Sequence, residues 1–152
     1  MITRFRKPEM GQAAQRERLA GEDALVEHDF DEAIRHIKRA LRLWKRVENT
    51  QEYVKDLNIL GMVHSMVSDE SAALDCYLES LATAAVMKSN EMKALSYSGI
   101  GSCFQRMGHH KEALVYFRNA RREHQHCEVS EEEDRAMWRI FNYLYIEGFS
   151  GD

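Results

Sequence analysis

Two histidines and a cysteine near the C-terminus, His124, His126 and Cys127, are the residues whose types could bind a metal ion. In a helix, residues i and i+2 point to opposite sides, so His124 and His126 cannot share an ion. His124 and Cys127 could do so, but two protein ligands fall short of the three or four that zinc sites use. We therefore expect no metal site and no cofactor in this chain.

Other residues with catalytic potential lack the partners that a reaction needs. His64 falls within an expected helix, where a core histidine is expected rather than a general base, and His109 and His110 fall in an expected turn. The sequence contains no GxSxG, P-loop or HExxH motif and no carboxylate pair placed for acid and base catalysis. We expect no catalytic residues and no enzymatic activity in this segment, whereas a catalytic domain further along a longer protein stays open.

A cluster of basic residues occupies one expected helix, residues 30–47. It consists of Arg35, Lys38, Arg39, Arg42, Lys45 and Arg46. Such a cluster could contact phosphates, but no aromatic residue is interleaved for base stacking, because Trp44 belongs to the apolar face. The chain as a whole has a net charge of −4 and a pI near 6.0. We expect neither a nucleic-acid partner nor a membrane partner, and we interpret this helix as a solvated face, with the docking of an acidic partner as the alternative.

The composition favours an all-helical protein of the cytoplasm. Cys76, Cys103 and Cys127 are odd in number and form no CxxC pair, which argues against a disulfide framework and favours a reducing compartment. No run of 18 apolar residues occurs, and no apolar segment follows the basic residues at the N-terminus. The only proline, Pro8, is expected to precede the first helix, and Ala, Leu, Glu, Arg and Met are abundant.

The elements that would position these residues repeat every forty residues. The spacing relates Gly21, Gly61 and Gly101, then Ala33, Ala73 and Ala113, and then Ala40, Ser80 and Ala120. A strict period in this range is typical of stacked helical or helix–strand units, none of which can bury its apolar face alone.

Helix-capping residues set the expected boundaries of the elements. Capping boxes are formed by Asp29 with Glu32, Asn49 with Glu52 and Ser130 with Glu133, and Gly108 suits a helix end. We predict seven helices, at residues 9–27, 30–47, 50–67, 70–88, 90–107, 110–127 and 131–147. The connections are short, so consecutive helices are expected to lie antiparallel.

The repeated residues resemble those of the tetratricopeptide repeat family. That family has an apolar residue followed by Gly, then Ala, then a large apolar residue and Ala at fixed positions of each unit. The matching residues are Ala20-Gly21, Leu60-Gly61 and Ile100-Gly101; Ala33, Ala73 and Ala113; Ile37, Tyr77 and Phe117; and Ala40, Ser80 and Ala120. Two departures are the period of forty rather than 34 residues and the absence of the family's usual proline, which is replaced by Lys45, Ala85 and Gln125.

The resemblance implies one all-α domain over residues 1–152, a right-handed superhelical α-solenoid. Three helix pairs, at about 14–53, 54–93 and 94–133, are followed by a partial unit at 134–152. That last helix carries Trp138, Tyr143 and Tyr145, which are too apolar for a polar cap and could form a homodimer. We therefore expect a fragment of a longer protein, rather than an array with a native terminal cap.

In this family the first helix of each pair lines a ligand groove, which implies a set of candidate binding residues. They are Arg18, Glu22, Lys55, Asn58, Met62, Met66, Arg106, Arg135 and Trp138. Guanidinium, amide and thioether groups suit a protein or peptide segment with acidic and bulky apolar residues. The alternative is that these residues form solvated helix faces.

Two kinds of binding protein remain open from the sequence. The carboxylate clamp of chaperone-binding members is not kept, because Glu22, Ile59, Leu95 and Gly99 replace its Asn, Asn, Lys and Arg. The long period resembles that of N-terminal sensory arrays in bacterial signalling proteins, including diguanylate cyclases of the GGDEF type and transcription factors. A free-standing adaptor is the alternative.

Overall fold

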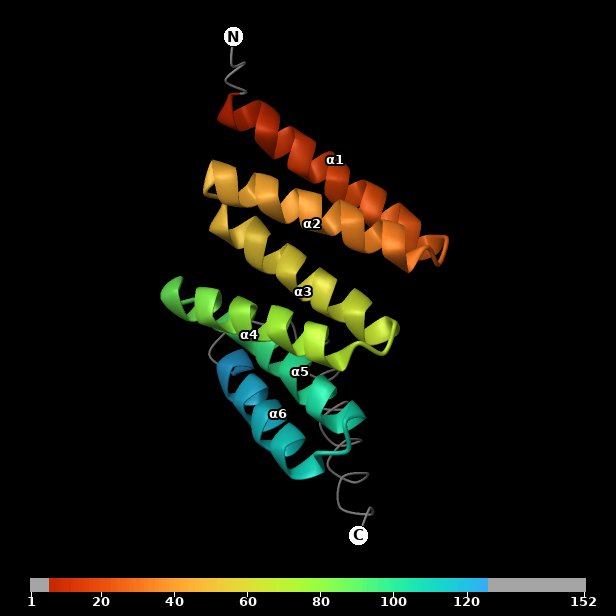
Figure 1. Cartoon of the computed structure of the whole chain (residues 1–152). Helices are drawn as coiled ribbons and strands as arrows, with labels where there is room; N and C mark the ends of the chain where they lie inside the picture. The colour runs from red at the N-terminus through yellow and green to blue at the C-terminus, as the bar shows by residue number, and fades with distance from the viewer. Residues whose placement is uncertain (1–5, 126–152) are drawn as a thin grey trace. The chain divides into compact units, whose positions relative to one another are not determined.

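The computed structural model describes residues 6–125, and this part of the chain contains six α-helices (Figure 1). They are α1 (Lys7–Val26), α2 (Phe30–Val47), α3 (Thr50–Met66), α4 (Glu70–Val86), α5 (Asn90–Arg106) and α6 (His110–His124). The all-α prediction and the boundaries of these six helices are confirmed to within a few residues. The seventh helix, expected at residues 131–147, lies outside the described residues, so an array of seven helices is not supported.

The first helix begins earlier than expected. Pro8 was expected to precede it, but Pro8 lies in the first turn of α1. A proline fits there because the backbone N–H groups of a first turn have no partner within the helix, so nothing is lost when one is missing. The prediction on Pro8 is therefore wrong, because α1 begins at Lys7, two residues before the expected start.

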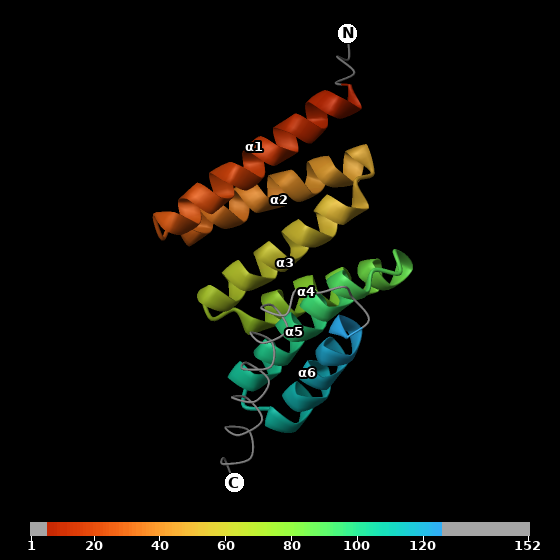
Figure 2. The same cartoon turned by 180° about the vertical axis from the view of Figure 1, so that it is seen from behind.

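The chain divides into two compact units, Met1–Cys76 and Tyr77–Asp152, with the boundary inside α4. In the first unit α1 and α2 lie side by side and antiparallel, and α3 packs against α2 (Figures 1 and 2). In the second unit α5 and α6 form a similar antiparallel pair. Helices that are consecutive in the chain thus pack as pairs, as the repeat predicts.

Each of the first five helices, α1 to α5, ends at a turn of the same kind, and these turns recur every twenty residues. One residue in each turn has a positive φ: His28 (59°), Glu48 (60°), Ser68 (62°), Lys88 (56°) and Gly108 (82°). The residue after it precedes the next helix directly, and the side chains of Asp29, Asn49, Asp69 and Ser89 each accept a hydrogen bond from the backbone N–H three residues on. Each helix and its turn therefore occupy half of the forty-residue period.

The repeated glycines allow a large side chain to lie directly on the neighbouring helix. A Cβ added at Gly21 would lie 2.8 Å from Cδ1 of Ile37, and one at Gly101 would lie 2.9 Å from the ring of Phe117. Ile37 is fully buried, and Phe117 is 6% exposed. The sequence register of glycine and large apolar residue is therefore a packing contact within the α1–α2 pair and within the α5–α6 pair.

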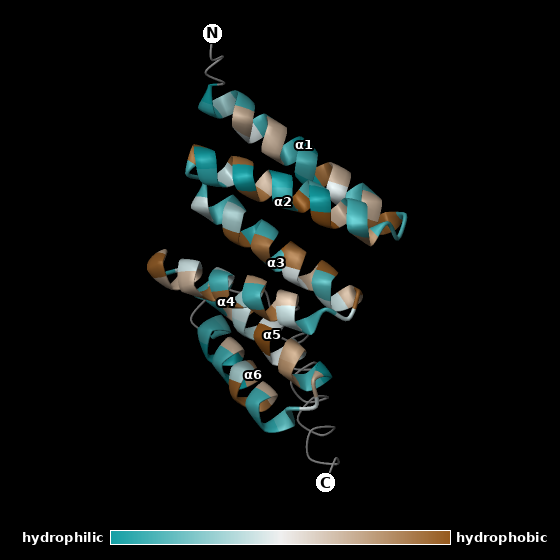
Figure 3. Ribbon diagram, viewed as in Figure 1, coloured by the Kyte–Doolittle hydropathy of each residue, from teal (hydrophilic) through white to brown (hydrophobic). Residues whose placement is uncertain are grey.

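Small residues complete the core of each unit. Ala33, Ala40, Ala73, Ala113 and Ala120 are all buried, as their repeated positions predict. In the first unit Ala40 packs with Ala14 and Trp44, and Ala33 packs with Ala24 and Val63. Hydrophobic and hydrophilic residues follow one another in bands along α2 and α3 (Figure 3). None of the described helices is long and apolar enough to cross a membrane.

Candidate functional site

The candidate binding residues lie on the first helix of each pair, as far as the structure describes them. Arg18 and Glu22 lie on α1, Lys55, Asn58, Met62 and Met66 on α3, and Arg106 on α5. Glu22 and Arg106 are exposed. Arg135 and Trp138 lie outside the described residues.

Four of these residues share one face of α3. Lys55, Asn58, Met62 and Met66 follow at steps of three, four and four residues, which places them in one row along the helix. Met62 is 43% exposed and Met66 is 53% exposed. The amide of Asn58 donates to the Val54 carbonyl oxygen at 3.1 Å, and Lys55 Nζ lies 3.1 Å from Glu52 Oε1. We call this row, Lys55 to Met66, the α3 face.

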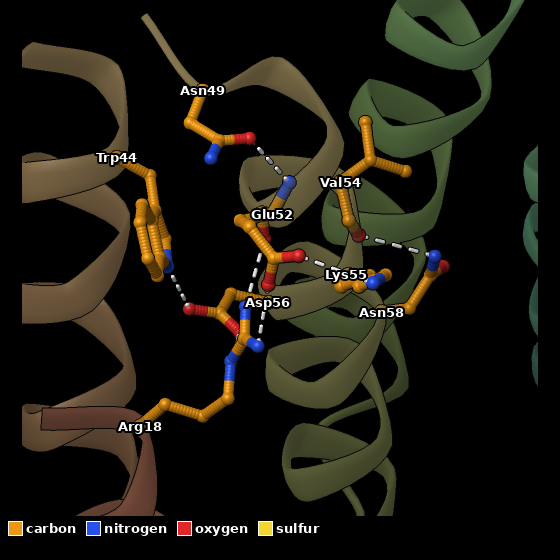
Figure 4. A network of polar contacts seen from close by, with 8 residues as sticks. All are labelled: Arg18, Trp44, Asn49, Glu52, Val54, Lys55, Asp56 and Asn58. Atoms are coloured by element: carbon orange, nitrogen blue, oxygen red, sulfur yellow. Dashed lines mark hydrogen bonds and ion pairs between the residues drawn. The ribbon is translucent and has the colours of Figure 1, made fainter. Parts of the chain in front are cut away.

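Arg18 lies instead in a buried cluster that joins α1, α2 and α3 (Figure 4). Its Nε contacts Asp56 Oδ1, one terminal nitrogen lies 2.6 Å from Glu52 Oε2, and the other donates to the Glu52 backbone oxygen at 3.2 Å. The Arg18 side chain is only 11% exposed, and its guanidinium carbon lies 5.5 Å from the ring centre of Trp44. A role for Arg18 in binding a ligand therefore stays a prediction, and it would require this cluster to open.

Asp56 is the centre of the cluster and is completely buried. Besides Arg18, it accepts a hydrogen bond from the indole Nε1 of Trp44 at 2.8 Å. A buried carboxylate without such partners would be strongly unfavourable. The cluster therefore fixes three helices to one another through a single acid.

Burial and the charged partners act in opposite directions on the pKa values of the residues in the cluster. Burial raises the pKa of Asp56, although the bonds from Arg18 and Trp44 oppose this. Burial also acts to raise the pKa of Glu52, but the bonds from Arg18 and Lys55 outweigh it and lower the value. Burial acts to lower the pKa of Arg18, and its bonds to Asp56 and Glu52 raise it overall. These pKa shifts are those of a buried cluster of ion pairs that holds the helices together, and they do not indicate a reactive group.

Asp56 was not among the residues singled out from the sequence, although a signal was present. It lies three residues after Tyr53, four before Leu60 and seven before Val63, so it shares the buried face of α3. A carboxylate on an apolar face demands a cation or several donors. The two donors come from other helices, at positions that no local pattern identifies.

His64 is another titratable residue considered from the sequence. His64 is half-buried on α3, and burial lowers its pKa, with Lys38 acting in the same direction and Asp69 opposing. In the part of the chain that the structure describes, no three His, Cys, Asp or Glu side chains lie together in a way that could hold a metal. Of the three residues His124, His126 and Cys127, only His124 lies within the described residues.

Comparison with known proteins shows which family this architecture represents. Residues 17–85 match the family model described as Tetratricopeptide repeat. No curated protein matches the chain.

Solved structures share the fold at low sequence identity. The N-terminal domain of stress-induced protein-1 from C. elegans is 18% identical with a TM-score of 0.67, and the match covers 90% of this chain and 97% of that one. The apo form of RapI is 15% identical with a TM-score of 0.82, covering 93% of this chain and 39% of RapI. The complex of the TPR2AB domain of yeast Sti1 with pHSP90 gives 18% identity and a TM-score of 0.66, covering 91% and 51%.

The chain thus spans less than two thirds of the length of RapI and of the yeast Sti1 segment. Tetratricopeptide repeat domains are protein-binding modules and are typically non-catalytic. The sequence period, the helix pairs and the family model agree: residues 17–85 of this chain match the tetratricopeptide repeat family, and solved structures of that fold cover nearly the whole chain.

Proposed function

We propose that this chain binds a peptide segment of a partner protein through the α3 face, Lys55 to Met66. The single observation that carries the proposal is the exposure of Met62 and Met66 in line with the Lys55 ammonium group. Thioether side chains adapt to bulky apolar residues, and an ammonium group attracts a carboxylate. The favoured ligand therefore carries an acidic residue and, further along, a bulky apolar one.

Two further points support this choice of surface. Exposed large apolar side chains in a row are typical of interaction sites rather than of solvated helix faces. Among the solved structures of the same fold, the yeast Sti1 domain is in complex with pHSP90. Glu22, Arg106, Arg135 and Trp138 remain proposed contributors to ligand binding, and Arg18 contributes only if its buried contacts are exchanged.

The proposal is tested by charge insertion into the α3 face. A peptide array of twelve-residue segments, each with one acidic cluster and one Leu, Phe or Trp, is probed with the purified chain. Met66→Glu should abolish binding to the positive peptides, and Lys55→Ala should weaken it. Val115→Glu on α6 is the matched control, because Met66 and Val115 are each 53% exposed. Equal binding by the wild type and Met66→Glu, or equal loss with Val115→Glu, would contradict the proposal.

We further propose that the binding module is the sensory or regulatory part of a larger signalling protein. The support is the period of forty residues, longer than the common 34. Association of two chains through residues 131–147 belongs to the same proposal. A reading frame that continues into an output domain, together with a dimer in sedimentation, is the expected result; a monomer without such a domain favours a free-standing adaptor.

A further inference from the structure

A surface hollow of about 540 Å³ lies along α2, and none of the residues of the α3 face is among those that line it. It is lined by Glu17 of α1 and by Arg39, Arg42, Leu43, Lys45 and Arg46 of α2. The four cationic side chains are exposed, and Leu43 is half-buried against the core formed by Ala14, Ala40 and Trp44. We call these six residues the basic hollow.

The basic hollow has four cations but only one acid in its lining. Arg35, one turn earlier on α2, pairs with Glu32, but within residues 6–125 none of the four hollow cations makes an ion pair. The one acid in the lining, Glu17, is already bonded through Oε2 to His36 Nδ1 at 2.6 Å. The cluster is therefore open to an external anion.

This concentration of charge is unfavourable for the isolated helix. Arg42 is three residues from Arg39 and Lys45 and four from Arg46, and like charges at these spacings repel one another. The helix dipole compensates only for Lys45 and Arg46, which lie in the last turn. The chain as a whole carries a net charge of −4, so the basic hollow is a local reversal of its charge. A bound anionic partner would relieve this repulsion.

We propose that the basic hollow docks an acidic peptide segment of a partner protein. Arg39 and Arg46 are seven residues apart, which is about 10 Å along a helix. In a polyproline II peptide, which has three residues per turn and rises about 3.1 Å per residue, carboxylates three residues apart lie on the same side at about this distance. An apolar side chain between the carboxylates would lie beside this row, next to Leu43, and the arginines would hold the carboxylates through paired N–H groups.

The lining favours a peptide over a nucleic acid. Single-stranded nucleic acids need exposed aromatic rings for stacking, and the nearby Trp44 is 5% exposed with its Nε1 bonded to Asp56. The apolar floor at Leu43 has no use in contacts with a phosphate backbone. The basic hollow is a second docking surface, on a different helix from the α3 face, and it does not depend on the function proposed above.

The test measures the fluorescence anisotropy of a labelled peptide, Glu-Asp-Leu-Glu-Asp-Leu-Glu, titrated with the chain. Arg42→Glu with Arg46→Glu should weaken binding by at least about tenfold, because two charge-assisted contacts become repulsive. The matched control is Arg118→Glu with Arg122→Glu, two exposed arginines on α6 with the same i, i+4 spacing and the same change in net charge. We expect the control to change binding less than about twofold, since exposed charges at a distance are screened by salt.

Further measurements separate this proposal from its alternatives. An equal loss in both double variants would show a general effect of net charge and overturn the proposal. Stronger binding of oligothymidylate or phosphatidylserine vesicles than of the peptide, lost in the same variant, would also overturn it. If the reversal variant fails to fold, Arg42→Gln with Arg46→Gln replaces it, with the same expected direction. Met66→Glu should leave peptide binding at the basic hollow unchanged, so failure of the α3 face and failure of the hollow are distinguishable.

Discussion

The two units solve the same packing problem with different chemistry. Asp56 in the first unit and Ser96 in the second are forty residues apart, and both are completely buried. Asp56 is held by the Arg18 guanidinium and the Trp44 indole. Ser96 lies 2.7 Å from the Ser80 hydroxyl and donates to the Met92 carbonyl oxygen at 2.9 Å.

The difference follows from the neighbouring repeat positions. Forty residues after Arg18 and Trp44 stand Asn58 and Ala84, which could supply neither a cation nor an indole donor to Ser96. A serine pair satisfies itself with few outside partners, whereas a buried carboxylate needs donors from two other helices. Equivalent buried positions of two repeats can therefore hold either a carboxylate in an ion pair or a neutral hydroxyl pair, provided that the hydrogen-bonding partners on the other helices change with it.

The largest predicted effect comes from removing the acid at the centre of the charged brace. Asp56→Ala leaves the Arg18 guanidinium and the Trp44 indole short of a partner, and the breaking of a buried ion pair costs about 3–5 kcal/mol. Ser96→Ala removes a neutral hydroxyl pair and should cost about 1–2 kcal/mol. Amide hydrogen exchange, read on α3 and on α5, measures the two effects separately.

A conservative variant sharpens this comparison. Asp56→Asn keeps the shape and one acceptor for the Trp44 indole but loses the charge, so its cost should lie between those of Asp56→Ala and Ser96→Ala. If Asp56→Ala and Ser96→Ala lowered protection by the same amount, the distinction between the two units would fail.

The next effect concerns the glycine contacts of the two units. A Cβ added at Gly99 would lie 2.4 Å from the rigid ring of Tyr77, whereas at Gly21 the nearest atom, at 2.8 Å, is the terminal Cδ1 of Ile37. Overpacking against a ring destabilises a fold by about 1–3 kcal/mol, whereas replacing a helical glycine by alanine stabilises the helix by about 1 kcal/mol. Gly99→Ala should therefore destabilise the second unit by up to about 2 kcal/mol, while Gly21→Ala should be close to neutral.

Thermal unfolding followed by circular dichroism measures both glycine variants. Gly101→Ala, whose Cβ would lie 2.9 Å from the Phe117 ring, should give an intermediate loss. A loss at Gly21 larger than that at Gly99 would show that the flexible end of Ile37 cannot move within its buried site.

The smallest predicted effect is a dependence of the free energy of unfolding on pH. It comes from His64 in the first unit and has no counterpart at the equivalent position of the second unit. Burial lowers the pKa of His64 below its ordinary value of 6.5, so between these two values the unfolded chain binds more protons than the folded chain. The stabilising contribution is complete above pH 6.5 and is lost as the pH falls towards the lowered value. The counterpart forty residues on is Phe104, which stacks on Tyr116 at 5.3 Å and cannot titrate.

His64→Gln is the variant that tests this difference. The free energy of unfolding, measured by urea titration between about pH 5 and pH 7, should depend less on pH in the variant than in the wild type. Identical slopes would mean that His64 binds protons equally in the folded and unfolded chains.

The parts of the fold that depend on local periodicity were predictable from the sequence. Gly21 with Ile37 and Gly101 with Phe117 repeat in sequence, and their contacts are where the repeat register places them. The caps at Asp29 and Asn49 follow from a short-range motif and are confirmed. The prediction for Pro8 failed by two residues because a proline fits equally well before a helix and in its first turn.

The buried brace could not be predicted in the same way. The partners of Asp56, Arg18 and Trp44, lie on other helices, 38 and 12 residues away in the chain. The family resemblance assigns Arg18 to the ligand groove. Only the three-dimensional contacts show that its guanidinium already pairs with the buried Asp56. The residues of the α3 face, by contrast, are those that the family resemblance assigns to a ligand groove, and Met62 and Met66 among them are exposed.

Because the left-handed turns recur every twenty residues, the repeat units between them are equivalent in length and phase. Any two turns forty residues apart, such as those at His28 and Ser68, begin helices of the same kind in the same phase. Recombination between such turns adds or removes a whole helix pair without shifting the apolar face of any helix that remains. The equal spacing therefore allows such an array to change its length through unequal exchange within a gene, with each product retaining a complete set of cores.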